Sequence, residues 1–356
     1  MSLSLTAPRR GGRVALLALA LIFPLVFSNP TVTTIAVFTL MFAAAATSWN
    51  IFSGYTGYIA LGHAAFFGIG AYALAIMCQD WSIPGGYAPF LLLPLVGLIV
   101  GVCAIPLGWI ALRTRRHTFV VITIAIFFIM QLLAYNLTDI TNGSSGMDLP
   151  IPVTWSGAFF NVPFYYVTLV VLLLALGVSW WVRHSKYGLG LLAIRDDEDR
   201  ALGLGVKTWA YKLSSFVLSA IFVGMIGAVY GYFLGSIRPE FAFDALYDVA
   251  IALMAFMGGL GTLSGPILGA LILEPLQQYF ALQPWASNGL YLMLYGALFL
   301  VVILLLPEGV VPSLSRKWPG WMARRRGPPA VALATGAGDV PVRPETRTES
   351  REGVTP

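Results

Sequence analysis

Long apolar runs separated by short polar segments dominate the chain between Val14 and Leu306. Because a helix needs about 20 mostly apolar residues to cross the hydrocarbon core of a membrane, this length allows on the order of ten crossings. The runs are continuous rather than alternating, which favours helices over a β-barrel. We therefore predict an all-α polytopic membrane protein with spans at roughly 14–28, 31–51, 58–78, 88–112, 118–135, 164–182, 211–235, 247–260, 264–282 and 289–306.

The composition agrees with this pattern. Apolar residues make up 58% of the 356 residues and charged residues 10%, against roughly 25% charged residues in an ordinary soluble domain. The mean hydropathy is +0.80. These values indicate an integral membrane protein with a transmembrane domain at 14–306 and almost nothing left over for a soluble domain.

Basic residues are distributed unevenly between the predicted spans. If the N-terminus lies inside, all but one of the 21 Lys and Arg residues fall in cytoplasmic segments, namely 1–13, 113–117, 183–212 and the stretch after 306. Only Arg238 falls outside, as the positive-inside rule requires. The net charge of +5 is thereby explained without a nucleic-acid partner. Both termini are predicted to be cytoplasmic. This requires three crossings in the last apolar block, 247–306, and the first of them, the span at 247–260, must then be short or broken.

The two ends of the chain are predicted to lie outside the membrane. Residues 1–13 form a cytoplasmic N-terminus. The basic and then apolar start could be a signal peptide, but no small-x-small cleavage site follows, so we favour a first transmembrane helix. Residues 307–356 form a cytoplasmic tail rich in Arg, Pro, Gly and Glu. Such a composition cannot bury enough apolar surface to offset its ordering entropy, which predicts disorder after about residue 318.

One long polar segment interrupts the apolar runs, and we predict a cytoplasmic loop at 183–210. Four consecutive acids suit the first turn of a short helix, where free backbone N–H groups and the positive end of the helix dipole favour negative charge. These acids are Asp196, Asp197, Glu198 and Asp199. Gly203 and Gly205 can end that helix. The segment gives a soluble partner something to bind, although a merely solvated loop is the alternative.

Catalytic and cofactor chemistry is not visible in the sequence. No G-x-x-x-x-G-K-[ST] motif occurs, so the chain is not expected to hold a nucleotide phosphate in a P-loop. His63, His117 and His184 are far apart and have no metal-ligand partner at short spacing, which argues against a zinc site. No nucleophile, base or metal constellation indicates an enzyme. We predict no catalytic residue, no metal and no bound cofactor.

Few polar groups fall within the spans. They are Glu274 and Asp248, expected near span ends, with Gln131, Asn50 and His63. Ion-coupled transport usually needs buried carboxylates or a coordinating cluster, and such a relay is not evident. Transport against a gradient would then be driven from outside the membrane domain, through 183–210. His63 is the unusual residue: a role in the translocation path and a role in helix packing are both open.

Glycines cluster in two of the predicted spans. The first cluster is Gly54, Gly57, Gly62, Gly68 and Gly70, and the second is Gly258, Gly259, Gly261, Gly265 and Gly269. Small residues let helix backbones approach closely. Clusters that include a proline, as here with Pro266, also allow broken helices where the backbone lines a cavity. Both interpretations, close packing and a translocation path, remain open.

The predicted outer loop at 136–163 carries acids but no Lys or Arg. Its small polar run is Gly143, Ser144, Ser145 and Gly146. We expect this run to face a binding protein or the outer mouth of the pathway. A plain flexible loop is the alternative.

Four motifs in order also resemble a known family. They are SGYTGYIALGHAAFFGIGAY at 53–72, LTDITNGSSGMDLPIP at 137–152, LGLLAIRDDEDRALGLGVKTWAYKLSSFVLSA at 189–220 and FMGGLGTLSGPILGA at 256–270. Together they are similar to the permease subunits of bacterial branched-chain amino-acid ABC transporters, and more closely to the LivM-type subunit. The resemblance runs from about residue 31 to Pro312.

The resemblance implies a fold and a set of partners. The fold would be similar to vitamin B12-type importers, with ten or so helices in the bacterial inner membrane. The partners would be a LivH-type sister permease, two ATP-binding subunits that use the ATP, and a periplasmic substrate-binding protein. The resemblance also assigns ATPase coupling to Arg195, Asp196, Asp197, Glu198 and Gly205. The sequence departs from the family pattern at Asp199, Arg200 and Gly203, where small or apolar residues are more usual.

The sequence therefore predicts a permease for a small zwitterionic solute, branched-chain or other apolar amino acids, with alternating access driven by partner ATPases. A permease for urea or short-chain amides is the alternative within the same class. A passive channel or facilitator that needs no motor is the alternative from another class. A membrane enzyme is disfavoured because no catalytic constellation occurs.

Overall fold

The computed structural model describes residues 10–27, 29–152, 155 and 158–281, and residues 293, 296, 297, 300, 309 and 310 singly. The chain forms two compact units, 1–315 and 316–356, and every described residue lies in the first. The predicted last span at 289–306, apart from those single residues, and the predicted disordered tail lie outside the described residues.

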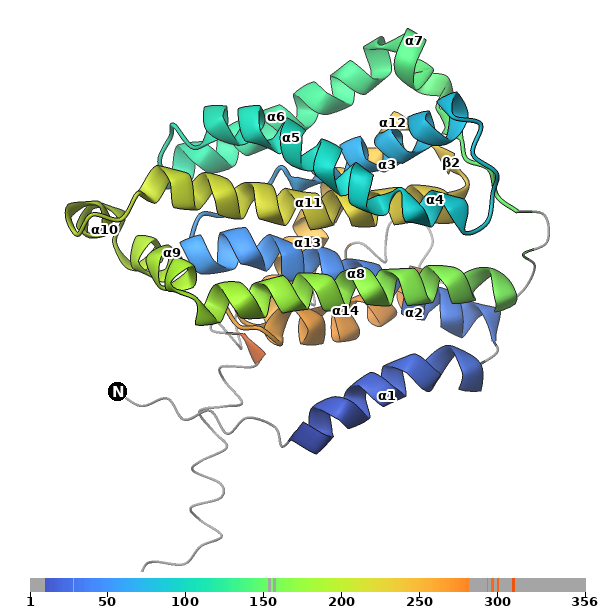
Figure 1. Cartoon of the computed structure of the whole chain (residues 1–356), viewed down its shortest axis with the longest axis horizontal. Helices are drawn as coiled ribbons and strands as arrows, with labels where there is room; N and C mark the ends of the chain where they lie inside the picture. Colours follow the sequence, from blue (N-terminus) through green and yellow to red (C-terminus); the bar gives the residue numbers. More distant parts are fainter. Residues whose placement is uncertain are drawn as a thin grey trace, which may run out of the picture. The chain divides into compact units, whose positions relative to one another are not determined.

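Helices account for nearly all of the described structure (Figure 1). The long helices are α1 (Arg10–Val26), α2 (Pro30–Trp49), α3 (His63–Asp80), α5 (Leu93–Ala111), α6 (Arg116–Asn136), α8 (Ala158–His184), α9 (Lys186–Asp196), α11 (Thr208–Leu234), α13 (Ala245–Gly258) and α14 (Gly265–Ala281). The short ones are η1 (Asn50–Gly54), α4 (Ala88–Leu91), α7 (Thr138–Thr141), η2 (Gly143–Ser145), α10 (Glu198–Gly203) and α12 (Pro239–Ala242).

Every predicted span up to residue 282 corresponds to a helix, with two changes. The span predicted at 58–78 begins only at His63, because residues 57–62 are not helical. The span predicted at 88–112 is divided into α4 and α5. Six helical stretches in the described part are long and apolar enough to cross a membrane: Pro30–Gly54, Leu93–Ala111, His117–Asn136, Phe159–His184, Thr208–Leu234 and Pro239–Gly258. The short helix expected at 247–260 is α13, which has 14 residues.

The helices run between two polar ends. The connections at 112–115 and 185–207 lie together at what we call the basic end, where α9 and α10 project in Figure 1. The connections at 81–87, 137–152 and 235–244 meet at the far end, beside α4 and α7. There β1 (Met147–Asp148) pairs antiparallel with β2 (Ser236–Ile237), the only sheet in the described residues.

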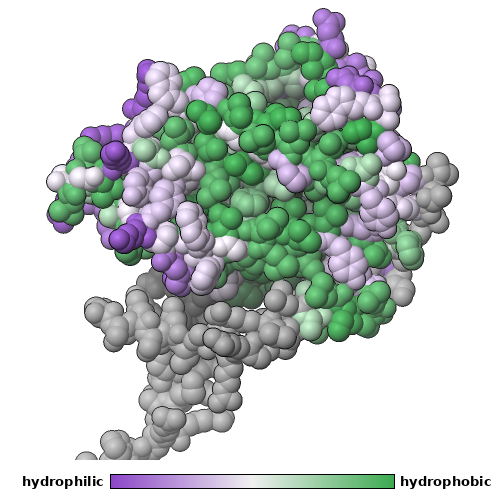
Figure 2. Space-filling model, in the orientation of Figure 1, coloured by the Kyte–Doolittle hydropathy of each residue, from purple (hydrophilic) through white to green (hydrophobic). Residues whose placement is uncertain are grey.

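An apolar surface separates the two ends (Figure 2). Large apolar side chains of α5, α6 and α8 are exposed, for example Leu98, Leu132 and Leu174. Exposed aromatic residues flank this surface, with Trp81 at the far end and Trp181 at the basic end. Aromatic belts of this kind mark the membrane–water interfaces. The molecule is therefore a multi-pass membrane protein.

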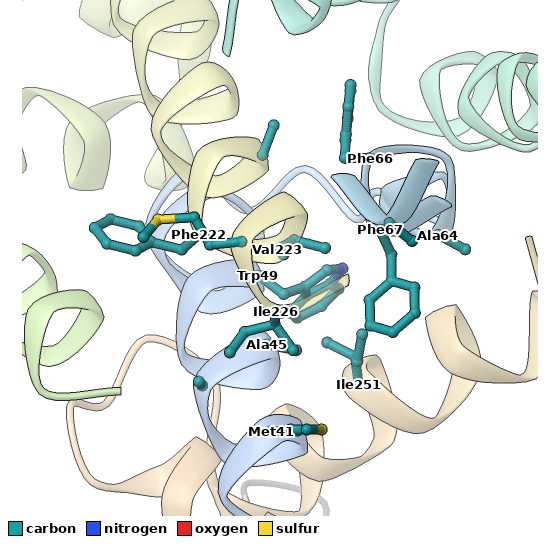
Figure 3. Packing of buried hydrophobic residues seen from close by; sticks show 14 of the residues in the cluster. Met41, Ala45, Trp49, Ala64, Phe66, Phe67, Phe222, Val223, Ile226 and Ile251 are labelled. Carbon is teal, nitrogen blue, oxygen red and sulfur yellow. The ribbon is translucent and has the colours of Figure 1, made fainter. Parts of the chain in front are cut away.

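The core forms around α11, which packs against α2, α3 and α5. Aromatic and branched side chains from these helices interdigitate, including Trp49, Phe67, Val223 and Ile226 (Figure 3). Glycine allows α3 and α11 to approach closely, since a Cβ atom at Gly70 would lie 2.0 Å from the backbone oxygen of Gly224. Such close approach is the main source of helix association in a bilayer, where burial of apolar surface gains little.

Two helix breaks lie side by side near the basic end. After α2, the chain passes through the π-turn η1 and then the non-helical residues 57–62 before α3 begins. Between α13 and α14, residues 259–264 form a turn. Asn50 joins the two breaks: its amide donates to the carbonyl of Thr262 at 3.0 Å and accepts from the N–H of Gly261 at 2.8 Å.

Candidate functional site

The polar segment at 183–210 is helical rather than a loop. The α8 helix continues to His184, α9 covers Lys186–Asp196, and only six residues form α10. Asp197 is the N-cap of α10, and its carboxylate accepts from the N–H groups of Asp199 and Arg200 at 3.1 and 3.0 Å. The prediction that the acids occupy the first turn is therefore confirmed for Glu198 and Asp199 but wrong for Asp196, which ends α9.

Gly205 terminates α10. Its φ of +87° lies in the left-handed region, and the N–H of Val206 donates to the carbonyl of Ala201 at 3.0 Å. The N–H of Gly205 itself donates to Leu202 at 3.0 Å. This pair of hydrogen bonds is the Schellman motif, in which a glycine commonly occupies the left-handed position. Gly203 is the last helical residue and needs no special conformation.

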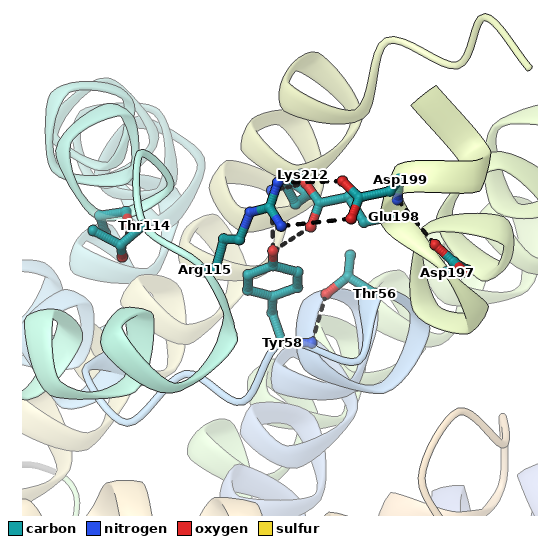
Figure 4. Close-up of polar contacts among 9 residues, drawn as sticks. Thr56, Tyr58, Thr114, Arg115, Asp197, Glu198, Asp199 and Lys212 are labelled. Carbon is teal, nitrogen blue, oxygen red and sulfur yellow. Dashed lines mark hydrogen bonds and ion pairs between the residues drawn. The ribbon is translucent and has the colours of Figure 1, made fainter. Parts of the chain in front are cut away.

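Glu198 points inward from α10 to a buried partner (Figure 4). One carboxylate oxygen lies 2.5 Å from the ammonium of Lys212 on α11, and the other accepts from the hydroxyl of Tyr58. The Lys212 side chain is 5% exposed, and its nitrogen lies 4.5 Å from the centre of the Tyr58 ring. These contacts join α10, α11 and the non-helical segment 57–62 through one charged, largely dehydrated cluster.

The cluster changes the protonation chemistry of Glu198. Burial raises the pKa of this carboxyl, but hydrogen bonds from Lys212 and Tyr58 and the positive charges of Lys212 and Arg115 outweigh burial. The net effect holds the pKa of Glu198 below its ordinary value. The carboxylate is therefore ionised at neutral pH and remains paired with the lysine ammonium.

Arg195 also points inward rather than toward a partner. Its guanidinium donates to the carbonyl of Gly54 at 2.9 Å, at the end of η1. Arg183 on α8 donates in the same way to the carbonyl of Gly261 at 2.9 Å, in the turn before α14. Positive groups at helix C-termini satisfy free carbonyls and complement the helix dipole. Arg195 and Arg183 thus satisfy backbone carbonyls at the two helix breaks, one after η1 and the other between α13 and α14.

The outward side of the segment has a different character. Asp196 is exposed at the end of α9, and it lines a cavity of about 490 Å3 with Arg115, His117 and Asp199. Leu202 and Leu204 are 59% and 83% exposed. They lie on α10 and at its end, away from the apolar membrane surface. These two leucines offer apolar surface that a partner protein could cover.

His63, the candidate for the translocation path, is fully buried at the first turn of α3. Its Nε2 lies 2.8 Å from the hydroxyl of Ser219 on α11. The next N–H, of Ala64, donates at 3.0 Å to the carboxylate of Asp248 on α13. In the described part of the chain, Nδ1 of His63 and the second oxygen of Asp248 have no hydrogen-bond partner. These contacts are those of a residue that packs helices together. A role for His63 in the translocation path stays a prediction.

The glycine candidates lie where backbones or side chains meet. A Cβ atom at Gly62 would lie 2.3 Å from the carbonyl oxygen of Thr123, and one at Gly258 would lie 1.7 Å from that of Gly265. Gly68 faces the ring of Phe243. The remaining candidates, Gly57, Gly259 and Gly261, have φ values of +74°, +115° and +72° in the two breaks. Packing and chain reversal therefore account for their positions.

At the far end, the run of small polar residues is ordered. Gly143–Ser145 form η2, and Gly146 adopts a φ of +74° beside the backbone of Ile237. Ser144 is exposed. The loop is shorter than predicted, because α8 already begins at Ala158. Its role toward a binding protein stays a prediction.

Three buried polar residues differ from what the sequence predicts. The charge distribution assigns Lys212 to the cytoplasmic segment 183–212, although the structure buries it in α11. No feature of the sequence identifies Tyr58. Glu274 was expected near a span end but is fully buried in the middle of α14, with the amide of Gln278 at 3.0 Å. A charge inside an otherwise apolar run is the signal that identifies Lys212 and Glu274.

Among the described residues, no group of three or more His, Cys, Asp or Glu side chains could hold a metal ion. Apolar helices and a short capped helix projecting at the basic end define a multi-pass membrane protein with a polar projection. The model of the family described as "Branched-chain amino acid transport system / permease component" matches residues 31–303. The chain belongs to this family of transport permeases, as the sequence motifs predicted.

Curated relatives agree with the family. The chain is 26% identical over 324 residues to the permease protein LivM of the high-affinity branched-chain amino acid transport system of Escherichia coli (strain K12), covering 84% of this chain and 74% of that protein. It is 24% identical over 287 residues to LivH of Salmonella typhimurium, covering 76% of this chain and 91% of that protein. These matches confirm the LivM-type resemblance. No solved structure gave a significant match.

Proposed function

We propose that this chain is the LivM-type permease subunit of an ATP-driven importer and that it transports branched-chain or other apolar amino acids. The names of the relatives that match over most of the chain support this substrate class. The apolar helices are consistent with a zwitterionic solute whose charges cancel. We further propose that specificity resides largely in a substrate-binding protein.

The proposal includes partners that complete the transporter. A LivH-type permease would pair with this chain, two ATP-binding subunits would contact the basic end, and a periplasmic binding protein would contact the far end near Ser144 and Ser145. ATP would be bound and hydrolysed by the partners and not by this chain. Relatives of both the LivM and LivH types match the chain, which supports a pair of similar permeases.

The membrane arrangement follows from the charges. We propose about ten crossings in the bacterial inner membrane, with the basic end and both termini in the cytoplasm. Arg115, Lys186 and Lys207 are among the basic residues of that end, and cytoplasmic loops carry the excess of Lys and Arg. The vitamin B12-type fold remains the expectation from the resemblance.

One observation carries the proposal: Leu202 on α10 and Leu204 at its end are exposed outside the apolar membrane surface, and Asp196 is exposed at the end of α9. Burial of a leucine side chain stabilises a contact by about 1.5–3 kcal/mol. A partner ATPase with an apolar groove and a basic residue would match this surface. Because the carboxylate of Glu198 points inward to Lys212 and Tyr58, we propose that its part in coupling lies within the chain rather than in direct docking.

The test is co-purification from native membranes with a tag on the C-terminal tail, followed by mass spectrometry. The wild type should recover two ATP-binding subunits and a second permease. The double variant Leu202→Asp/Leu204→Asp should retain the second permease and lose ATPase recovery by about tenfold or more. Leu137→Asp places the same change on an exposed leucine at the far end and should keep the ATPases.

Two results would redirect the proposal. A homo-oligomer that recovers no ATP-binding subunit would contradict the importer and favour a passive facilitator. A complex that includes the ATPases but takes up labelled urea and not leucine would favour the urea or short-chain amide alternative. Uptake measured in proteoliposomes that contain the matching binding protein distinguishes the two substrates.

A further inference from the structure

Besides the docking surface, the polar segment contains an internal link formed by Glu198, Lys212 and Tyr58 (Figure 4). We infer that Lys212 and Tyr58 are positioning residues that make α11 and the segment 57–62 move with α10. A displacement of α10 would thereby reach the start of α3. This inference rests on the proposed function, in which a partner ATPase moves α10.

The burial of the link makes it resistant to separation. Lys212 and Glu198 have side chains that are 5% and 24% exposed. If α10 moved alone, the ammonium of Lys212 would remain inside the protein without its counter-charge. An unpaired buried charge is strongly unfavourable. The least costly movement keeps the pair together and carries the basic end of α11 along with α10.

Tyr58 extends the link to a different part of the bundle. Its hydroxyl donates to Glu198 and also accepts from the ammonium of Lys212 at 3.3 Å. The ring is 1% exposed and meets the edge of Phe119 on α6 at a centroid distance of 5.5 Å. Because Tyr58 belongs to a non-helical segment, its movement need not break any helical hydrogen bond.

The segment 57–62 leads directly to the centre of the bundle. The next residue is His63, whose Nε2 lies 2.8 Å from the hydroxyl of Ser219 on α11. The N–H of Ala64, which follows, donates to the carboxylate of Asp248 on α13. Within the segment, the carbonyl of Ala60 accepts from the indole of Trp49 on α2 at 2.8 Å. A shift of Tyr58 is therefore transmitted to contacts with α2, α11 and α13.

Two other contacts between elements at the basic end do not have these properties. The Arg115–Asp199 pair has side chains that are 83% and 71% exposed, and surface pairs of this kind contribute little. The hydroxyl of Tyr187 on α9 lies 2.7 Å from that of Ser214 on α11. That contact joins α9 and α11 without involving α10 or the segment 57–62, so Tyr187 provides a matched control.

The experiment compares uptake per ATP hydrolysed in proteoliposomes that contain the whole transporter, its binding protein and labelled leucine. The variants are Tyr58→Phe, Glu198→Gln and Lys212→Met. Each should keep the ATPase subunits bound and hydrolysis near the wild-type rate, while uptake per ATP falls about three- to tenfold, as for substitutions within a coupling network. Tyr187→Phe should leave uptake per ATP unchanged.

Further comparisons make the test decisive. The double variant Glu198→Gln/Lys212→Met should unfold at a higher temperature than Glu198→Gln alone, because no buried charge is left unpaired, but its uptake per ATP should stay reduced, because the link is absent. Tyr58→Phe removes only a hydroxyl, so it remains informative if another variant does not fold. Wild-type uptake per ATP in all three single variants would overturn the inference, as would loss of the ATPases, which would make Glu198 a docking residue. If the wild type itself binds no ATPase, the proposed function is wrong. The inference is then wrong too, because it requires an ATPase that moves α10.

Discussion

At the scale of single residues, glycines control how closely the helices approach. Gly70 on α3 has no space for a methyl group, because a Cβ atom would lie 2.0 Å from the backbone of Gly224. We expect Gly70→Ala to force α3 and α11 apart and to lower the free energy of unfolding by roughly 1–3 kcal/mol. Gly177 on α8 is exposed with open space around it, so Gly177→Ala should be neutral or slightly stabilising. Thermal unfolding in detergent measures both, and equal Tm values for the two variants would refute the packing argument.

The ionisation of Glu198 gives a second prediction for a single residue. Its pKa is lowered in the folded protein, so the carboxylate stabilises the fold above the ordinary value of 4.5, and this stabilisation is lost as the pH falls through the lowered pKa. The Tm difference between the wild type and Glu198→Gln should therefore be constant from pH 7.5 to about 5. It should narrow only at lower pH. If the Tm difference between the two proteins already disappears between pH 7 and 5, burial dominates and the pKa of Glu198 is raised.

The candidate residues were predictable only where the signal was local. The cap at Asp197 and the left-handed Gly205 follow from residue type and spacing, and the structure contains both. The partners of Glu198 are 14 and 140 positions away. No sequence period connects such residues, so Tyr58 could not be found, and Lys212 could be recognised only as a charge within an apolar run.

At the scale of elements, α10 is too short to be stable without its caps. Isolated helices of this length are unstable in water, and the N-cap of Asp197 is one of its local supports. We expect Asp197→Ala to cost about 1 kcal/mol and to speed amide exchange of residues 198–203 by about fivefold. Asp197→Asn keeps an acceptor and should leave exchange near the wild-type rate. Hydrogen exchange with mass spectrometry provides the comparison, and equal protection in both variants would show that tertiary contacts alone hold α10.

The helices themselves were largely predictable, and the two glycine clusters allowed broken helices, but the sequence did not decide between a break and close packing. Hydropathy identifies a span by its apolar content, and residues 57–62 are as apolar as a helix needs to be. The break forms because other elements satisfy its backbone: Leu61 donates to the hydroxyl of Thr123 at 3.2 Å, and Ala60 to that of Ser53 at 3.3 Å. Non-helical backbone at membrane depth requires such partners, and they come from other elements of the fold.

At the scale of the whole molecule, the two polar ends differ in what they contain. The basic end combines buried ties between elements with an exposed apolar and acidic surface on α10. The far end is held by neutral contacts, such as the hydroxyl of Tyr232 donating to the carbonyl of Gly86 at 3.0 Å. This asymmetry is what a membrane protein needs if force is applied from one side only and solute arrives from the other.

The orientation of the molecule can be tested directly. Leu204 at the basic end and Ser144 at the far end are both exposed, and the two native cysteines can be replaced by alanine. If the basic end lies in the cytoplasm, as proposed from the positive-inside rule, a membrane-impermeant maleimide should label Ser144→Cys in spheroplasts and leave Leu204→Cys unmodified. In inverted vesicles the labelling should be reversed. Labelling of Leu204→Cys from outside would place α10 beyond the reach of any cytoplasmic ATPase, and the docking surface and the internal link would then need a different explanation.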